Sequence, residues 1–232
     1  MAAVAAAVLR ASPVFAGLPV REVEALAALA VEEPVRARDY VFMEGDPAHS
    51  LYLVKSGHVR IVRQGRAGRD VVLELLGPGE VFGGVAVMEQ RPYPASAQAS
   101  EPSAVVKISA EAVRALAARH PSIIREMALM MGRRLRSAHD SVKALAVDPV
   151  EARLAAALLR LVAREGERVP DGVTLGFHLT RQALADMTGT TVETTIRVVS
   201  RWIKDGLVSD DEHRLVLRDT EALRTLAEDV ER

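Results

Sequence analysis

The chain has 232 residues, 49% hydrophobic and 26% charged, a composition that excludes disorder over most of its length. Thirty Lys and Arg against 31 Asp and Glu give a formal net charge of −1, so any basic surface for nucleic acid must be local. The absence of cysteine excludes disulfides, thiolate nucleophiles and Cys-ligated zinc or iron–sulfur clusters.

No apolar run approaches the roughly 20 residues that a membrane-spanning helix needs. The alanine-rich start lacks the basic residues that precede the apolar stretch of a secretory signal. We therefore expect a cytoplasmic protein of one or two domains that does not associate with membranes.

The first part of the chain, to about residue 115, is predicted to be mostly β-structure. A helix is expected before the strands, at roughly Pro19–Val31. Short β-type runs then alternate with glycine-containing turns, at 40–42, 51–54, 59–62 and 71–76. Short, regularly spaced strands of this kind indicate a sandwich or barrel.

A long helix is predicted from about Pro121 to Leu145, with Gly132 as its only glycine. Its apolar residues recur at steps of three or four, close to the a/d repeat of a coiled coil. The members of this seam are Ile124, Met127, Met131, Leu135, Ala138, Val142 and Leu145. The pattern favours a dimerisation helix with adaptable methionine packing; the alternative is a single amphipathic helix docked on its own domain.

The third part opens with an apolar helix, Val150–Glu165, followed by a Gly/Pro/Asp break and a strand at Val173–Leu179. A short helix from Thr180, a turn at Thr188-Gly189 and a second helix at Thr191–Lys204 then predict a helix-turn-helix. The small Ala185 and Gly189 permit the close helix crossing that this unit needs. A hairpin is expected around Asp210–His213.

The second helix of this unit separates into two faces. Thr195, Val198, Val199 and Trp202 are predicted to lie inward. The outward face holds Glu193, Ile196, Arg197, Ser200, Arg201 and Lys204. Such a face suits a DNA major groove, where Arg bridges guanine O6 and N7, Glu accepts from the cytosine amino group and an apolar side chain touches a thymine methyl.

Phosphate contacts are expected from Arg181 and Gln182 at the start of the first helix, and from Arg201 and Lys204. Between Arg181 and Lys204 the chain has four basic and two acidic residues, although the region from residue 150 onward is acidic overall. The positive charge is therefore concentrated on the predicted DNA-reading unit.

Each residue also has a purely structural interpretation. Thr190 and Glu193 fit a capping box that closes the helix start. Arg197 is spaced to pair with Glu193 at i, i+4, for about 0.2–0.5 kcal/mol. Ile196 is an apolar residue on a polar face, and single exposed apolar residues are common.

The whole chain from about residue 14 resembles the Crp/Fnr family of bacterial transcription regulators. The resemblance rests on Gly45–Ala48, Leu51–Gly57, Gly79–Gly83 and Leu179–Arg197, the last with Val-Glu-Thr-x-x-Arg at 192–197. It implies an α+β protein with a cyclic-nucleotide-binding-type β-roll at 1–115, a dimerisation helix at 116–147 and a winged helix-turn-helix at 148–232. It also implies a homodimer on double-stranded palindromic DNA, with RNA polymerase as a further partner if the protein is an activator.

The resemblance places Glu193 and Arg197 on the family's main base-contacting positions. Val192 resembles the Fnr branch, which favours a TTGAT-type half-site; where that branch usually has Ser, this chain has Ile196. The predicted DNA-contacting set is Arg181, Gln182, Thr191, Val192, Glu193, Thr194, Ile196, Arg197 and Arg201. The effector and the sign of regulation stay open.

Cyclic-AMP-binding members carry Gly-Glu and then Arg-Ser in a phosphate cassette, and the Arg holds the phosphate. Here Gly84 aligns with the Glu, and Tyr93-Pro94 with Arg-Ser. The predicted pocket is therefore degenerate, which argues against cyclic AMP because an unpaired phosphate is costly to bury. Its residues are Phe82, Gly83, Gly84, Val85, Tyr93, Pro94, Ala95 and Ser96.

The run from Arg91 to Ala99 most resembles the denitrification-regulator (Dnr-like) subgroup, some members of which sense nitric oxide through haem. Haem is therefore an alternative cofactor, with His49, His58, His120 and His139 as candidate ligands, each also explicable as a surface or turn histidine. A third alternative is a roll that binds nothing.

The sequence indicates no enzyme, because GxGxxG, Walker A, GxSxG and metal-spaced histidine pairs are absent. A different class of alternative is a small-ligand-binding module or adaptor that acts through protein partners.

Overall fold

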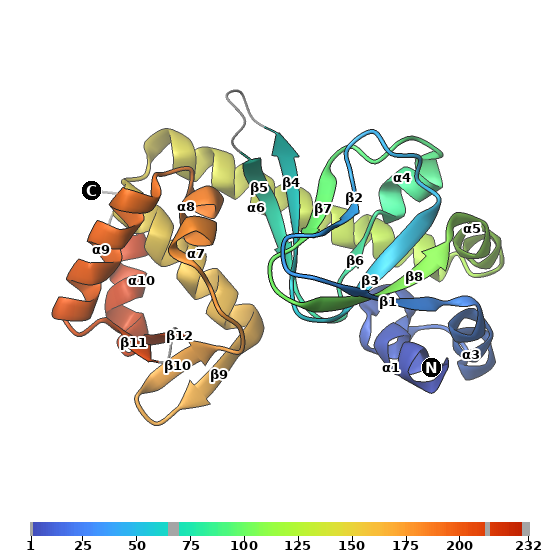
Figure 1. Cartoon of the computed structure of the whole chain (residues 1–232), viewed down its shortest axis with the longest axis horizontal. Helices are drawn as coiled ribbons and strands as arrows, with labels where there is room; N and C mark the ends of the chain where they lie inside the picture. Colours follow the sequence, from blue (N-terminus) through green and yellow to red (C-terminus); the bar gives the residue numbers. More distant parts are fainter. Residues whose placement is uncertain (1, 65–69, 212–213, 229–232) are drawn as a thin grey trace. The chain divides into compact units, whose positions relative to one another are not determined.

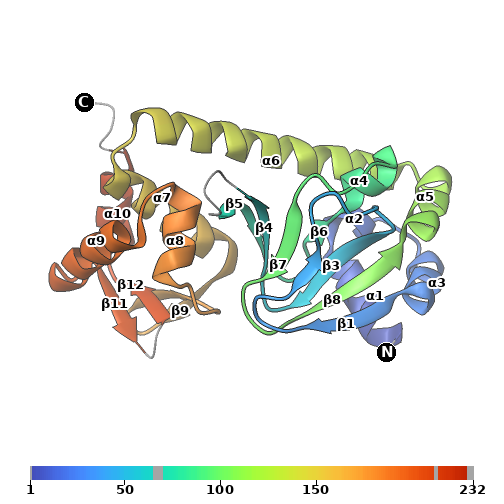
Figure 2. The same ribbon diagram turned by 45° about the horizontal axis from the view of Figure 1, so that its top comes forward.

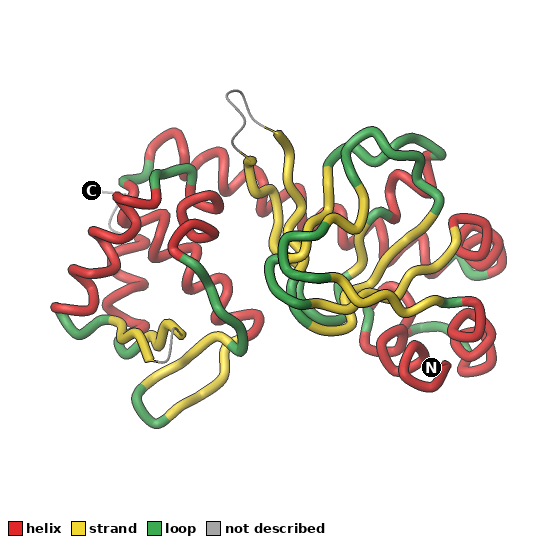
Figure 3. The backbone as a smooth tube through the Cα atoms, viewed as in Figure 1, coloured by secondary structure: helices red, strands yellow, loops and turns green. Residues whose placement is uncertain are grey.

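The computed structural model describes residues 2–64, 70–211 and 214–228. The chain divides into two compact units, Met1–Leu135 and Arg136–Arg232. Helices and strands occur in both (Figure 3), which confirms the predicted α+β class. The glycine-containing turn expected between the runs at 59–62 and 71–76 (residues 65–68) and the tip of the expected hairpin (residues 212–213) lie outside the described residues.

The N-terminal unit is built on two four-stranded antiparallel sheets, ordered β1-β8-β3-β6 and β2-β7-β4-β5 (Figure 1). The strands are β1 (Val31–Val35), β2 (Tyr40–Phe42), β3 (Ser50–Ser56), β4 (Val59–Gln64), β5 (Asp70–Leu76), β6 (Val81–Phe82), β7 (Ser96–Ala99) and β8 (Ser103–Ser109). The four predicted strands are confirmed as β2 to β5. Strands β1, β6, β7 and β8 were not predicted.

Strand β3 is buried on both faces, which explains its uninterrupted apolar sequence. Leu51 and Leu53 point into one apolar cluster, which they share with the helices of the unit. Tyr52 and Val54 point into a second cluster inside the roll. Successive side chains of a strand alternate between its faces, so an apolar residue is needed at every position here.

Among the described residues of this unit, five helices and the first half of a sixth accompany the sheets. They are α1 (Ala2–Ala11), α2 (Pro13–Ala16), α3 (Val20–Leu29), α4 (Gly84–Glu89), α5 (Ala110–Arg119) and the start of α6 (Ser122–Val147). Helix α1 is the alanine-rich start, and it packs against α3 (Figure 2). Its Leu9 is fully buried together with Phe15 of α2.

Helix α6 confirms the predicted long helix, but one member of its predicted seam was wrong. Met127 is only 5% exposed and packs into the core of its own unit. The seam instead continues through the exposed Ala128, because the spacing 124, 128, 131, 135, 138, 142, 145 alternates regularly between four and three residues. Ile124, Leu135, Val142 and Leu145 are between 44% and 66% exposed.

Among its described residues, the C-terminal unit contains the second half of α6 and four further helices. The further helices are α7 (Val150–Glu165), α8 (Arg181–Thr188), α9 (Val192–Lys204) and α10 (Thr220–Glu228). The strands, ordered β11-β12-β10-β9, are β9 (Gly166–Val169), β10 (Gly172–Leu175), β11 (Val208–Asp211) and β12 (Arg214–Leu217). The β11–β12 hairpin confirms the predicted wing.

Two predictions in this unit were wrong. The segment taken as a plain break forms β9, which pairs with β10 in a hairpin. The strand predicted over Val173–Leu179 ends at Leu175, since Phe177 and Leu179 turn into the core instead of continuing the ladder.

Candidate nucleic-acid interface

The turn between α8 and α9 depends on Gly189. Its φ of +62° is in the left-handed region, and a Cβ added there would lie 2.6 Å from the Leu145 Cδ2 atom. The Thr190 amide donates to the Ala185 carbonyl at 3.1 Å, and Ala185 is fully buried. Gly189 therefore supplies the left-handed turn, and the small, buried Ala185 lies where the chain before α9 returns to α8.

The start of α9 is closed by Thr191, not by Thr190. The Thr191 Oγ1 accepts from the Thr194 amide at 3.2 Å. Thr194 thus occupies the third helical position, where a capping box has Glu or Gln, and Glu193 lies one position earlier. The capping-box interpretation of Glu193 is wrong, and its carboxylate is not used to close the helix.

Helix α9 separates into the two predicted faces. Thr195, Val198, Val199 and Trp202 are at most 6% exposed and anchor the helix in its unit. The predicted outward face is exposed at every position: Glu193, Ile196, Arg197, Ser200, Arg201 and Lys204. Thr191 at the N-cap is exposed, whereas Val192 and Thr194 are partly buried.

Glu193 and Arg197 are spaced for an ion pair but do not form one. Within the described part of the chain, neither side chain has a hydrogen bond or ion pair with another residue. The proposal that they only pair with each other therefore has no support. A carboxylate and a guanidinium stand free, one helical turn apart, on the outward face.

Other predicted DNA contacts already have partners within the protein. The Arg181 Nη2 atom lies 2.7 Å from the Asp210 Oδ2 of strand β11. The Gln182 amide donates to the Asp186 Oδ1 at 2.7 Å. Both side chains would have to leave these partners to reach a phosphate.

Arg201 belongs to a similar internal arrangement at the other end of α9. Its guanidinium forms an ion pair with Glu151 of α7. The same carboxylate accepts from the Trp202 Nε1 at 2.8 Å. Sequence reasoning missed Glu151, because it is 50 or more residues away along the chain and no local pattern marks it.

The predicted effector region is lined and partly filled by aromatic rings. Tyr93 is 3% exposed, its ring is stacked on Phe42 with centroids 3.7 Å apart, and its hydroxyl donates to the Ser50 carbonyl at 2.5 Å. Tyr52 and Phe82 are stacked beside it at 5.3 Å. Burial raises the pKa of Tyr93, and to a smaller extent that of Tyr52, so both phenols stay neutral well above pH 7.

Gly84, at the position that the resemblance assigns to a glutamate, has little room for a side chain. A Cβ there would lie 2.8 Å from the Met127 Cε and 3.0 Å from the Leu51 Cδ1. Gly83 has a φ of +74°, and its added Cβ would lie 3.0 Å from the Tyr93 ring. Ala95 is buried, Val85 and Ser96 are partly buried, and Pro94 is exposed.

The candidate haem ligands do not converge on one place. His49 and His139 are exposed, and the His120 Nε2 lies 3.6 Å from a Glu22 oxygen. His58 is 5% exposed, so it is a buried turn histidine, and its Nδ1 lies 2.6 Å from the Glu101 Oε1. The arrangement does not fit a haem with an axial histidine.

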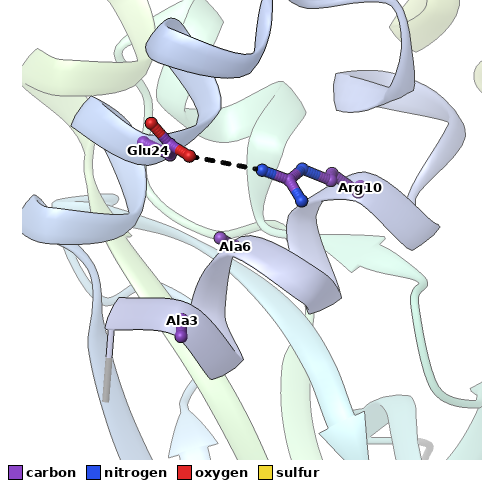
Figure 4. A pocket seen from close by; sticks show the side chains of 4 residues that line it. All are labelled: Ala3, Ala6, Arg10 and Glu24. Carbon is purple, nitrogen blue, oxygen red and sulfur yellow. Dashed lines mark ion pairs between the residues drawn. The ribbon is translucent and has the colours of Figure 1, made fainter.

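A shallow hollow between α1 and α3 is lined by Ala3, Ala6, Arg10 and Glu24 (Figure 4), but its two charged groups are 3.6 Å apart and pair with each other. Among the described residues, no group of three His, Cys, Asp or Glu side chains could hold a metal ion. None of the described helices is both long and apolar enough to cross a membrane.

A β-roll, a long helix and a winged helix-turn-helix with a free polar face define a DNA-binding regulator, and known families match both units. The family described as cyclic nucleotide-binding domain matches residues 32–120. The family described as Crp-like helix-turn-helix domain matches residues 152–226.

Relatives and solved structures agree with this assignment. The cyclic AMP receptor protein of Thermus thermophilus is 32% identical over 221 residues, which cover 94% of this chain and 98% of that protein. The transcriptional activator protein Anr of Pseudomonas aeruginosa is 28% identical, over 84% of this chain and 79% of that protein. The structure of FixK2 from Bradyrhizobium japonicum superposes with a TM-score of 0.76 at 25% identity, over 85% of this chain and 96% of that one.

The chain therefore belongs to the Crp/Fnr family of transcription regulators. This confirms the resemblance at the level of the family. The Dnr-like subgroup, the individual DNA contacts and the proposed boundaries at 115 and 147 stay predictions.

Proposed function

We propose that this protein is a homodimeric regulator that binds a palindromic DNA site through α9 without needing a cyclic nucleotide. The observation that carries the proposal is the outward face of α9. Glu193 and Arg197 stand there exposed, with no partner in the described part of the chain, opposite a fully anchored apolar stripe. A fixed helix with free Arg and Glu side chains has the chemistry to bind guanine and cytosine edges.

The proposal of cyclic-nucleotide independence rests on Tyr93 and Gly84. A phosphate needs a cationic partner when it is removed from water, and the aligned position holds a neutral, buried phenol instead. The relative from Thermus thermophilus is named for cyclic AMP, which favours a cyclic-AMP-responsive alternative. Calorimetric titration with cyclic AMP separates the two: we expect no binding heat, and micromolar binding would support the alternative.

The test of DNA reading is fluorescence anisotropy on a palindromic TTGAT-type duplex and on a scrambled duplex, at several salt concentrations. We expect selective binding that weakens steeply with salt, because phosphate contacts release counterions. Arg197→Ala should cost about 1–3 kcal/mol on the palindrome and little on the scrambled duplex. Arg224→Ala is the matched control, since Arg224 is exposed on α10 and pairs with Glu221. Selectivity that survives Arg197→Ala would refute the groove assignment.

A further inference from the structure

Helix α9 exposes an isoleucine within the face that is proposed to bind DNA. Ile196 is 48% exposed, three residues after Glu193 and next to Arg197. It is the fifth residue of the helix, and the N-terminal part of a recognition helix is the part that contacts base edges. An apolar side chain at this place has no polar group with which to recognise a base.

We infer that Ile196 recognises the 5-methyl group of a pyrimidine in the major groove. This inference rests on the proposed function and extends it to the chemistry of one base position. The 5-methyl group is the apolar feature on the major-groove edge of thymine, and 5-methylcytosine carries the same group. A branched aliphatic side chain is the complementary surface, because the contact removes both apolar groups from water.

The surroundings of Ile196 fix where its methyl groups point. Thr191 caps the helix start, while Val198 and Trp202 on the opposite side are at most 6% exposed. The helix therefore cannot rotate without exposing its anchor. Ile is also restricted in χ1 within a helix, so the side chain loses little freedom on contact.

Glu193 and Arg197 indicate which base pair lies next to the proposed methyl contact. Glu193 offers an acceptor for a cytosine amino group, and Arg197 offers donors for a guanine. Neither group is held by another side chain in the described residues, so both are available beside Ile196. The chemistry of the face thus matches a G·C pair next to a base that carries a 5-methyl group.

A second isoleucine on the same helix supplies the control. Ile203 is 40% exposed and follows Ile196 by seven residues, which is two turns or about 10 Å along the axis. It lies beyond the N-terminal part that is proposed to contact bases. Ile196→Ala and Ile203→Ala remove the same atoms from similarly exposed positions.

The experiment begins with a site that the wild-type protein selects from random duplexes. Each thymine of that site is then replaced by deoxyuridine, which removes only the methyl group, and each cytosine by 5-methylcytosine, which adds one. Binding is measured by anisotropy for the wild type, Ile196→Ala and Ile203→Ala. Thermal unfolding followed by circular dichroism confirms that both variants fold.

We expect one replacement to change the Kd of the wild type and of Ile203→Ala by about fourfold per half-site, and by about fifteenfold in both half-sites. Ile196→Ala should be insensitive to it. A loss with deoxyuridine identifies thymine as the source of the methyl group, and a gain with 5-methylcytosine identifies cytosine.

Equal responses of the wild type and Ile196→Ala to every replacement, with selective binding intact, overturn the inference alone. A wild-type protein that selects no sequence overturns the proposed function, and the inference with it.

Discussion

Single residues decide how the interior of the N-terminal unit is built. The resemblance assigns Tyr93 to the position of the cassette arginine of cyclic-AMP-binding members. Its ring is buried against Phe42 and its hydroxyl donates to the Ser50 carbonyl. Exchanging a cation for a phenol turns a position that binds anions into part of the core. The consequence appears in the pKa of Tyr93, which burial raises far above 10.0.

This pKa predicts an alkaline limit to the stability of the N-terminal unit. In the unfolded chain the Tyr93 phenol loses its proton near pH 10, whereas the folded chain retains it. The stabilisation is complete below pH 10 and is lost as the pH rises above that value, because the unfolded state then binds fewer protons.

Tyr93→Phe tests this limit. It should lower stability by about 1 kcal/mol at pH 7, from the lost hydrogen bond to Ser50, but should also flatten the decline above pH 10. Urea unfolding by circular dichroism at a series of pH values measures both. If the free energy of unfolding of Tyr93→Phe fell above pH 10 as steeply as that of the wild type, Tyr93 would not be the cause of the alkaline decline.

The ion pair between Arg181 and Asp210 predicts a gain in DNA affinity on substitution. Asp210→Asn removes the charge that holds Arg181 at 2.7 Å, so the guanidinium becomes available to a phosphate. We expect binding to selected and scrambled duplexes to tighten alike, by about 1 kcal/mol or less, because surface ion pairs are weak. Asp171→Asn controls for net charge, since Asp171 pairs with Arg218 elsewhere in the unit; an equal gain in that variant would contradict the role of Arg181.

At the scale of elements, α9 owes its orientation to contacts distant in sequence. Its apolar stripe packs inward, and Glu151 of α7 accepts from the Trp202 indole while pairing with Arg201. A hydrogen bond to a charged acceptor is stronger than a neutral one. The contact between α7 and α9 therefore fixes the rotation of α9 about its own axis, so that Glu193, Ile196 and Arg197 stay exposed.

Glu151→Ala should destabilise the C-terminal unit by about 1–3 kcal/mol, because it leaves the buried Trp202 N–H without its acceptor. Trp202 is the only tryptophan of the chain, so unfolding followed by tryptophan fluorescence reports on this unit alone. Glu151→Gln keeps an acceptor oxygen and should recover most of the loss. If Glu151→Gln were as unstable as Glu151→Ala, the ion pair with Arg201, and not the hydrogen bond from Trp202, would be the main contribution of Glu151 to stability.

At the scale of the whole molecule, the exposed seam of α6 predicts a dimer. Ile124, Leu135, Val142 and Leu145 lie on one heptad line and are 44% to 66% exposed. An apolar line of this length is unusual on a helix that faces only water. We expect a second copy of the same helix, which has the matching periodicity, to cover it.

Val142→Glu tests the dimer without disturbing the fold, since Val142 is 66% exposed. A carboxylate at a closed seam should raise the dimer Kd by at least about 100-fold, or roughly 3 kcal/mol. Sedimentation velocity measures the shift, and binding to a palindromic duplex should weaken with it. Lys143→Glu is the matched control beside the seam; a wild-type protein that sediments as a monomer would refute the dimer.

Structural features that depend on a pattern of a few consecutive residues could be predicted from the sequence. The strands β2 to β5 follow from β-type runs between glycines, and the faces of α9 follow from 3.6-residue periodicity. Strand β7, Ser96–Ala99, has small and polar residues without a strand pattern, and it forms because β2 and β4 pair with it on either side. Helix α4 begins at Gly84, although glycine has a low helix propensity. The Met127 side chain lies so close to the Gly84 backbone that a larger residue would not fit without a shift.

The sequence by itself determined the family, through motifs spread from Gly45 to Arg197. It also determined the helix-turn-helix and which residues of α9 face outward, because these depend on neighbours within a turn or two. Only the tertiary structure decided that Tyr93 fills the roll, that Asp210 holds Arg181 and that Met127 belongs to the core. The first two contacts join residues 43 and 29 positions apart, and chain closure, not local periodicity, brings such groups together. Met127 shows the same limit at short range, since a helical pattern gives the apolar side chains but not the neighbour each of them meets.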